Sequence, residues 1–321
     1  MKELLEKLRK AKGQTRIKAL CALRLIAQTD ESARKCIVDE GGVMLLSSLL
    51  GPFTSHAVGT EAIGILVRLP LDSEGKTSLT EPAKISLMVD LLHEGTMETR
   101  INSAKLIETL VDIEDLKSEN VSSFRLLFGL LRLVKDKKYP RAMAAGLSLL
   151  RIICSCKQVR IQVVGIGLVV QLVELLPYAT IPCLETSLAI LDILSTTPEG
   201  RAALKDCACT IPNIVRVLMR VSENYKQHAL SILWTVCKLA PEECTSTAVE
   251  AGIAAKLLLV IQSSCNPVVN SLQLSECIGD VERNHQNPSL QFHRIPGNCS
   301  AIHLPCICNP SLKCLCRAIS G

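Results

Sequence analysis

A short apolar block returns along the chain at an almost constant interval. The blocks read LLEKL, LSSLL, MVDLL, LLRLV, LVELL, VRVLM and LLLVI. Their last residues are Leu8, Leu50, Leu92, Val134, Leu176, Met219 and Ile261, so successive blocks lie 42 residues apart, with one interval of 43. A fixed period of this length indicates an array of stacked units, each of which buries its apolar face against its neighbours.

The repeated block ends a helix in each unit. In residues 166–176 this helix is apolar around most of its circumference, so we expect it to be buried. A short connector follows, often marked by proline, as at Pro52, Pro140 and Pro182. Proline there stops one helix and is not expected inside the next.

A longer helix comes next, with a small residue at a recurring place. These residues are Ala19, Ala62, Ala104, Ala145, Ser187 and Ala229. Small side chains let neighbouring helices approach closely, while the flanking Leu and Ile fill the layer between them. We call this the third helix of each unit and the buried one the second helix.

A short first helix opens the following unit. In residues 196–204, Thr197 is the expected N-cap and Pro198 takes the first turn. Glycine recurs where the first helix must turn into the second, at Gly41, Gly167 and Gly252. Three helices in about 42 residues is the armadillo period. We therefore predict an all-α, right-handed superhelical solenoid of three-helix armadillo repeats.

Composition limits the classes of function. The chain has 321 residues, of which 2% are aromatic, so large aromatic-lined enzyme pockets are not expected. Its 36 Lys and Arg are interleaved with 31 acids, which does not favour nucleic-acid binding. The most apolar window, 163–176, carries Gln171 and Glu174, so no membrane span is expected. Of the 16 Cys, most of those before residue 266 lie within helical Leu/Ala patterns, which suits small buried hydrophobes in a reducing compartment and predicts a cytoplasmic or nuclear location.

Several segments resemble a known family. GRAALKDC, HALSILWTVCKLAPEE, GIAAKLLLVIQSSCNP and the opening TRIKALCALRLIAQTDESARKCIVDEGGV are similar to the armadillo region of plant U-box E3 ubiquitin ligases, over about residues 1–268. In that family a U-box recruits a ubiquitin-charged E2 enzyme, and the repeats hold the protein to be modified. The resemblance implies a protein substrate or signalling partner, and an E2 partner only through a U-box.

The chain departs from the family pattern at both ends. No U-box segment precedes the first repeat helix, so we expect the chain to be non-catalytic by itself. After Pro267-Val268 the family continues with a basic Ala/Leu-rich helix, whereas here helical periodicity disappears. We therefore predict an armadillo domain of about six to seven repeats over 1–268, and a divergent, disordered tail rich in Cys and Pro over 269–321.

The chain offers few candidates for bond chemistry. The tail residues His303, Cys306, Cys308, Cys314 and Cys316 are spaced by one residue within pairs, which is too close for usual zinc motifs. The same spacing recurs in two pairs nearer the core, Cys154 with Cys156 and Cys207 with Cys209, for which we expect buried packing. His56, His93 and His228 have no recurring acid or Ser partner. We therefore predict no catalytic residues, no metal site and no cofactor.

The remaining candidate is a partner-binding groove lined by the third helices. Its predicted residues are Arg24, Arg68, Arg151, Asp192 and Trp234. Arg and Trp are residue types that anchor interfaces. The competing interpretation is a solvated arginine face with a core tryptophan.

Three functions remain open. The favoured one is the substrate- or partner-binding module of a U-box ubiquitin ligase. The second is a free-standing armadillo scaffold or decoy without ligase activity. The third is a nuclear-import adaptor, which is weaker because the places of its Trp and Asn ladders hold neither residue type: they hold Cys21, Gly64, Leu106, Leu147, Ala189 and Ser231, and Leu25, Arg68, Leu110, Arg151, Ile193 and Thr235.

Overall fold

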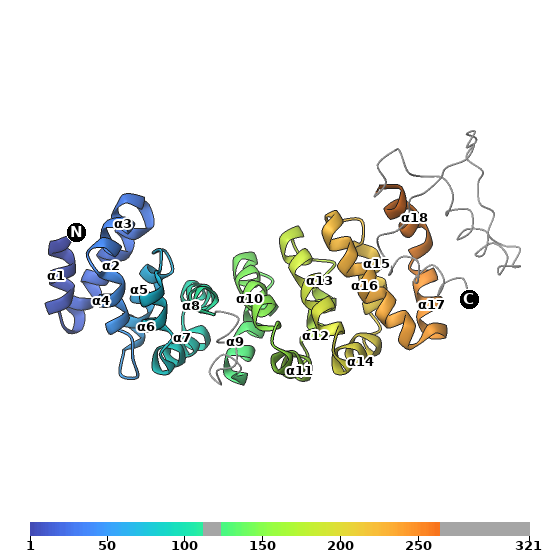
Figure 1. Cartoon of the computed structure of the whole chain (residues 1–321), viewed down its shortest axis with the longest axis horizontal. Coiled ribbons are helices and arrows are strands. Elements are labelled where there is room, and N and C mark those ends of the chain that lie inside the picture. The colour runs from blue at the N-terminus through green and yellow to red at the C-terminus, as the bar shows by residue number, and fades with distance from the viewer. Residues whose placement is uncertain (112–122, 264–321) are drawn as a thin grey trace, which may run out of the picture. The chain divides into compact units, whose positions relative to one another are not determined.

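The computed structural model describes residues 1–111 and 123–263, and every regular element within them is a helix (Figure 1). The first helices of the units are α3 (Glu31–Asp39), α6 (Ser73–Leu79), α11 (Lys157–Gly165), α14 (Pro198–Asp206) and α17 (Pro241–Glu250). The second helices are α1 (Lys2–Lys10), α4 (Gly42–Ser48), α7 (Pro82–Glu94), α9 (Phe124–Lys135), α12 (Leu168–Leu175), α15 (Thr210–Val217) and α18 (Ile253–Ser263). The third helices are α2 (Gly13–Thr29), α5 (His56–Leu66), α8 (Met97–Leu110), α10 (Pro140–Ile153), α13 (Ile181–Ser195) and α16 (Glu223–Leu239). The all-α armadillo prediction is confirmed.

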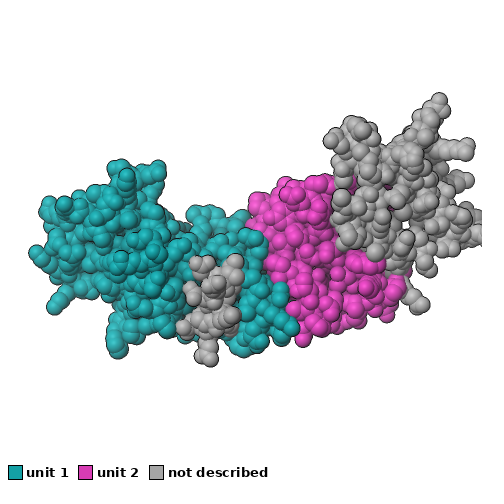
Figure 2. Space-filling view, viewed as in Figure 1, with its two compact units in different colours: residues 1–166 teal, residues 167–321 magenta. Residues whose placement is uncertain are grey.

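The chain divides into two compact units, Met1–Ile166 and Gly167–Gly321, shown in teal and magenta in Figure 2. In unit 1 the third helices α2, α5, α8 and α10 pack against one another in chain order. In unit 2 the third helices α13 and α16 pack together, and the second helix α12 packs on α15. Each unit is therefore a stack of layers. The predicted tail 269–321, with its candidate zinc ligands, lies outside the described residues.

The third helices that follow α2, namely α5, α8, α10, α13 and α16, bury the same pattern of side chains. Helix α16 buries Ala229 and Leu230, then Ile232 and Leu233. The same pattern begins at Ala62 in α5 and at Ser187 in α13. Each fully buried Leu or Ile stabilises its layer by about 1.5–3 kcal/mol. We call the small residue at the start of this pattern the register residue of its helix.

Two register residues differ from the prediction. In α8 the pattern opens at Ser103 rather than Ala104, and in α10 at Gly146 rather than Ala145. Both helices carry two adjacent small residues there, so composition alone did not determine the helix rotation. Both small residues of each pair are buried in α8 and in α10. In α2, by contrast, the register residue Ala19 is only half-buried.

The predicted turns and caps are confirmed. The backbone is left-handed at Gly41, Gly167 and Gly252, with φ of 72°, 83° and 76°, where each first helix turns into the second. The Thr197 hydroxyl accepts a hydrogen bond of 3.1 Å from the Gly200 amide at the start of α14. Pro140 and Pro182 lie in the first turn of α10 and α13 rather than in the connectors, because a helix needs no N–H donor there.

The cysteine prediction holds in part. Cys154 is buried, and burial raises its thiol pKa to about 12. Cys156 and Cys207, also predicted to be buried, are half-buried, and Cys209 is exposed. Cys209 immediately precedes α15 and Cys154 immediately follows α10, so neither lies within a helix. No single helix in the described ranges is long and apolar enough to cross a membrane; only α11 and α12 counted together across their bend reach that length and composition.

The first testable consequence concerns the packed layers. Ala104, on α8, is fully buried, whereas its neighbour Lys105 is exposed. Ala104→Arg should lower the free energy of unfolding by at least about 3 kcal/mol, because it overpacks a layer and buries a charge. Lys105→Glu should change it by less than about 0.5 kcal/mol. Urea unfolding followed by circular dichroism measures both, and a wild-type curve for Ala104→Arg would contradict the packing described here.

A second consequence concerns the left-handed turn. A Cβ at Gly167 or at Gly165 meets no atom within 4 Å, but only Gly167 has a positive φ. Gly167→Ala should therefore destabilise by about 1–2 kcal/mol through backbone strain alone. Gly165→Ala is the matched control and should stabilise by about 0.4–1 kcal/mol, because it restricts the unfolded chain. Equal melting temperatures for the two variants would contradict this assignment.

Candidate functional site

The five predicted groove residues lie on or just after third helices. Arg24 (α2), Arg68 (two residues after α5) and Arg151 (α10) belong to unit 1. Asp192 (α13) and Trp234 (α16) belong to unit 2. Arg151 is exposed and the other four are half-buried. Trp234 is therefore not a fully buried core residue, Arg24 and Arg68 are partly covered, and Arg151 is solvated.

In α2 and α13 the residue five places beyond the register residue connects its helix to the next third helix. Arg24 Nε donates to Glu61 Oε2 of α5 at 2.7 Å. Asp192 Oδ2 lies 2.7 Å from His228 Nδ1 of α16. Glu61 and His228 each stand immediately before the register residue of the next helix, so the two contacts are equivalent in different repeats. We call such a contact a rung.

The remaining third helices of unit 1 form rungs of other kinds. At the rung position of α8, Glu108 Oε1 accepts a hydrogen bond of 2.5 Å from the Ser148 hydroxyl of α10. Helix α5 has Val67 at that position, and its link to α8 comes from the next residue, since Arg68 Nη2 lies 3.6 Å from Glu98 Oε1. Consecutive third helices in unit 1 are thus joined by a polar contact at every step.

Arg24 and Arg68 also meet through one further side chain. When the Gln28 amide oxygen faces them, it lies 3.2 Å from Arg24 Nη1 and 3.3 Å from Arg68 Nη2. The Arg68 guanidinium donates in addition to the Gly64 carbonyl of its own helix. The structure therefore brings two of the predicted residues together. No ion pair or hydrogen bond joins Arg151 to another side chain of the described residues.

Sequence reasoning missed the partners of these residues. It identified neither Glu61 and Glu98 nor Gln28, and it took His228 to lack an acidic partner. His56 also has one, since its Nδ1 lies 3.6 Å from Glu94 Oε2. For Arg24–Glu61 and Asp192–His228 the available signal was an offset of 37 and 36 residues, slightly shorter than the repeat. The other pairs do not share this offset.

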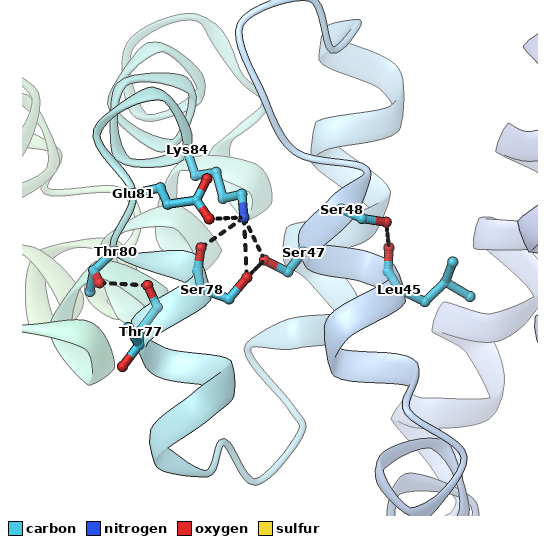
Figure 3. A network of polar contacts seen from close by, with 8 residues as sticks. All are labelled: Leu45, Ser47, Ser48, Thr77, Ser78, Thr80, Glu81 and Lys84. Carbon is cyan, nitrogen blue, oxygen red and sulfur yellow. Dashed lines mark hydrogen bonds and ion pairs between the residues drawn. The ribbon is translucent and has the colours of Figure 1, made fainter.

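A buried polar network lies elsewhere, among the first and second helices of unit 1 (Figure 3). Lys84 is 7% exposed, and its Nζ donates to Ser47 Oγ at 3.0 Å, to the Ser78 carbonyl at 2.8 Å and to Glu81 Oε1 at 3.0 Å. The hydroxyls of Ser47 and Ser78 are 2.8 Å apart. This buried charge is paired and hydrogen-bonded, which suits a link between α4, α6 and α7 rather than a reactive group.

The structure adds no candidate for metal or catalytic chemistry in residues 1–111 and 123–263. No group of three or more His, Cys, Asp or Glu in these ranges could hold a metal ion. With the corrected register, Lys105, Ser148, Thr109 and Ile152 replace the α8 and α10 residues that the nuclear-import comparison used. The described third helices still have no Trp or Asn ladder at those places.

Comparisons with known proteins agree with this architecture. The family described as plant U-box protein ARM repeat region matches residues 1–284. U-box domain-containing protein 30 of Arabidopsis thaliana is 57% identical over 264 residues, which cover 82% of this chain and 59% of that protein. U-box domain-containing protein 75 of Oryza sativa subsp. japonica is 53% identical over 269 residues, covering 83% and 58%. The chain thus spans about three-fifths of the length of these relatives.

Solved structures show the same fold at low sequence identity. A designed armadillo repeat protein in complex with the peptide (KR)4 is 18% identical, with a TM-score of 0.56, covering 73% of this chain and 98% of that one. A structure titled for a phosphorylation switch in the interaction between cadherin and beta-catenin is 15% identical, with a TM-score of 0.65, covering 81% and 48%. With the three-helix repeats and the match over residues 1–284, the chain belongs to the plant U-box protein ARM repeat family.

Proposed function

We propose that this chain is the partner-holding module of a U-box ubiquitin ligase, and that the partner lies along the third helices. The observation that carries the proposal is the set of Arg, Asp and Trp side chains that remain partly exposed on those helices in both units. These residue types anchor interfaces. The solved complex of a designed armadillo protein with a peptide supports protein partners for the fold.

In this proposal the chain makes and breaks no covalent bond. It raises the local concentration of the partner near an E2 enzyme that a U-box recruits. No group among the described residues is required as nucleophile or base. We place this activity in the cytoplasm or nucleus, because four buried thiols, those of Cys154, Cys183, Cys237 and Cys244, lie unpaired within the repeats.

Photocrosslinking tests where the partner lies. A photoreactive amino acid at Leu25 (α2, 58% exposed) or at Arg151 (α10) should crosslink one and the same protein in a plant extract. The matched positions Ile161 of the first helix α11 and Val170 of the second helix α12 are also exposed, and should not crosslink it. Crosslinking from the control positions alone would place the partner away from the third helices and refute the proposal.

Ubiquitination of that crosslinked protein tests the role. The purified chain with E1, E2, ATP and ubiquitin should form no polyubiquitin above an E2-only control. A U-box fused before residue 1 should modify the partner, whereas the same U-box alone should modify it at least about tenfold more slowly, because it lacks the gain in effective concentration. Equal rates with and without the repeats would favour the scaffold alternative, and activity of the unfused chain would contradict its non-catalytic role.

A further inference from the structure

Two guanidinium groups converge at one point on the third helices of unit 1. Arg24 Nη1 and Arg68 Nη2 lie 3.2 and 3.3 Å from the same amide oxygen of Gln28. Because both neighbours are donors, the oxygen and not the nitrogen of this amide must face them. The site thus holds a single acceptor oxygen between two permanently charged donors.

Other contacts hold both arginines in place. Glu61 binds Arg24 through Nε, which leaves Nη1 directed at Gln28. The Arg24 side chain lies over Gly64, where an added Cβ would come within 2.9 Å of Arg24 Cδ. Arg68 donates through Nη1 to the Gly64 carbonyl, which leaves Nη2 directed at Gln28. The donor geometry is therefore organised by residues other than Gln28.

The Gln28 amide is easily displaced from its position between the two guanidinium groups. Its side chain is exposed and neutral, so it can turn into solvent at little cost. A carboxylate has the same planar shape as this amide but carries a charge, and charge-assisted hydrogen bonds are about twice as strong as neutral ones. A carboxylate from outside would therefore bind both arginines better than the amide does.

The charge carried by helix α2 favours an acidic ligand, while Glu61 and Glu98 partly neutralise the two arginines. Helix α2 carries Arg16, Lys18 and Arg24 and has no acidic residue. Arg68 is only loosely neutralised, because Glu98 lies 3.6 Å away and is about half exposed. Leu25, beside Arg24 on α2, is 58% exposed and offers an apolar contact next to the charged one.

We propose that Arg24 and Arg68 form a carboxylate clamp that binds an Asp or Glu side chain of the partner protein, with Gln28 as the group it displaces. The clamp deepens the proposed function and rests on it, since it defines the partner segment as acidic, with an apolar residue beside the acid. A phosphoryl group fits less well, because its charge of about −1.5 to −2 would lie beside both Glu61 and Glu98.

The test uses the full chain and short fluorescein-labelled peptides followed by fluorescence anisotropy at low ionic strength. One peptide carries Glu and Leu in alternation, and two others replace Glu by Gln or Lys. The Glu peptide should bind saturably, and the Gln and Lys peptides should bind at least about tenfold more weakly. Preference for the Lys peptide, or no binding of the Glu peptide, would overturn the clamp.

Variants of the clamp itself make the test specific. Arg24→Gln with Arg68→Gln should weaken binding of the Glu peptide by about tenfold or more, while Arg132→Gln, at an exposed arginine of the second helix α9, should change it less than about twofold. If the double variant does not fold, as judged by circular dichroism, the Gln28 variants decide. Unchanged affinity in a folded double variant would refute the proposal.

Gln28 offers the sharper pair of substitutions. Gln28→Glu places a carboxylate inside the clamp, so it should raise the melting temperature by about 1–3 °C and block the Glu peptide. Gln28→Ala should leave binding unchanged or improve it. Tighter binding of the Glu peptide to Gln28→Glu than to Gln28→Ala would refute the role of Gln28 as the group that the ligand displaces.

A phosphoserine peptide that binds the clamp more tightly than the Glu peptide would refute the carboxylate assignment. If the Arg24, Arg68 and Gln28 substitutions do not change peptide binding, but the photoreactive residue at Leu25 still crosslinks the partner, the clamp is refuted and the proposed function stands.

Discussion

The packing of one third helix against the next is the constraint on which the rest of the structure depends. A single three-helix repeat is too thin to bury its own apolar face, so each layer must be closed by its neighbour. The close approach requires a small residue at one place in each helix, as at Ala62, Ser103 and Ala229, with Leu and Ile on either side. The sequence has a period of 42 residues because each repeat must meet this requirement at the same place.

The polar rungs lie at the edge of these layers. Contacts such as Arg24–Glu61 are partly exposed and contribute little to stability, about 0–1 kcal/mol each. They hold long side chains in defined positions on a rigid stack, however, and recognition depends on such preorganisation. In the proposed function the same residues connect repeats and face a partner. Lys84 represents the other case, a buried charge with every contact inside the fold.

In the proposed function, recognition is separate from covalent chemistry. The described helices supply the surface and charge that hold the partner, and the covalent step belongs to a U-box and an E2 enzyme. A stack of repeats can change specificity at one layer without disturbing the next, because each layer contacts only its neighbours. Arg24, which contacts Glu61, and Asp192, which contacts His228, occupy equivalent places in their repeats. The two residues carry opposite charges.

The sequence by itself determined the helical class, the period, the left-handed glycine turns and the Thr197 cap, because these depend on backbone geometry and on neighbours a few residues away. The tertiary structure alone decided the rotation of α8 and α10, where Ser103–Ala104 and Ala145–Gly146 offered two small residues each. It also decided which side chains meet: Gln28 with Arg68, or Asp192 with His228, come from different repeats. Such pairs depend on helix rotation and on packing across a layer, and a spacing of 36 to 40 residues carries no local signal of either.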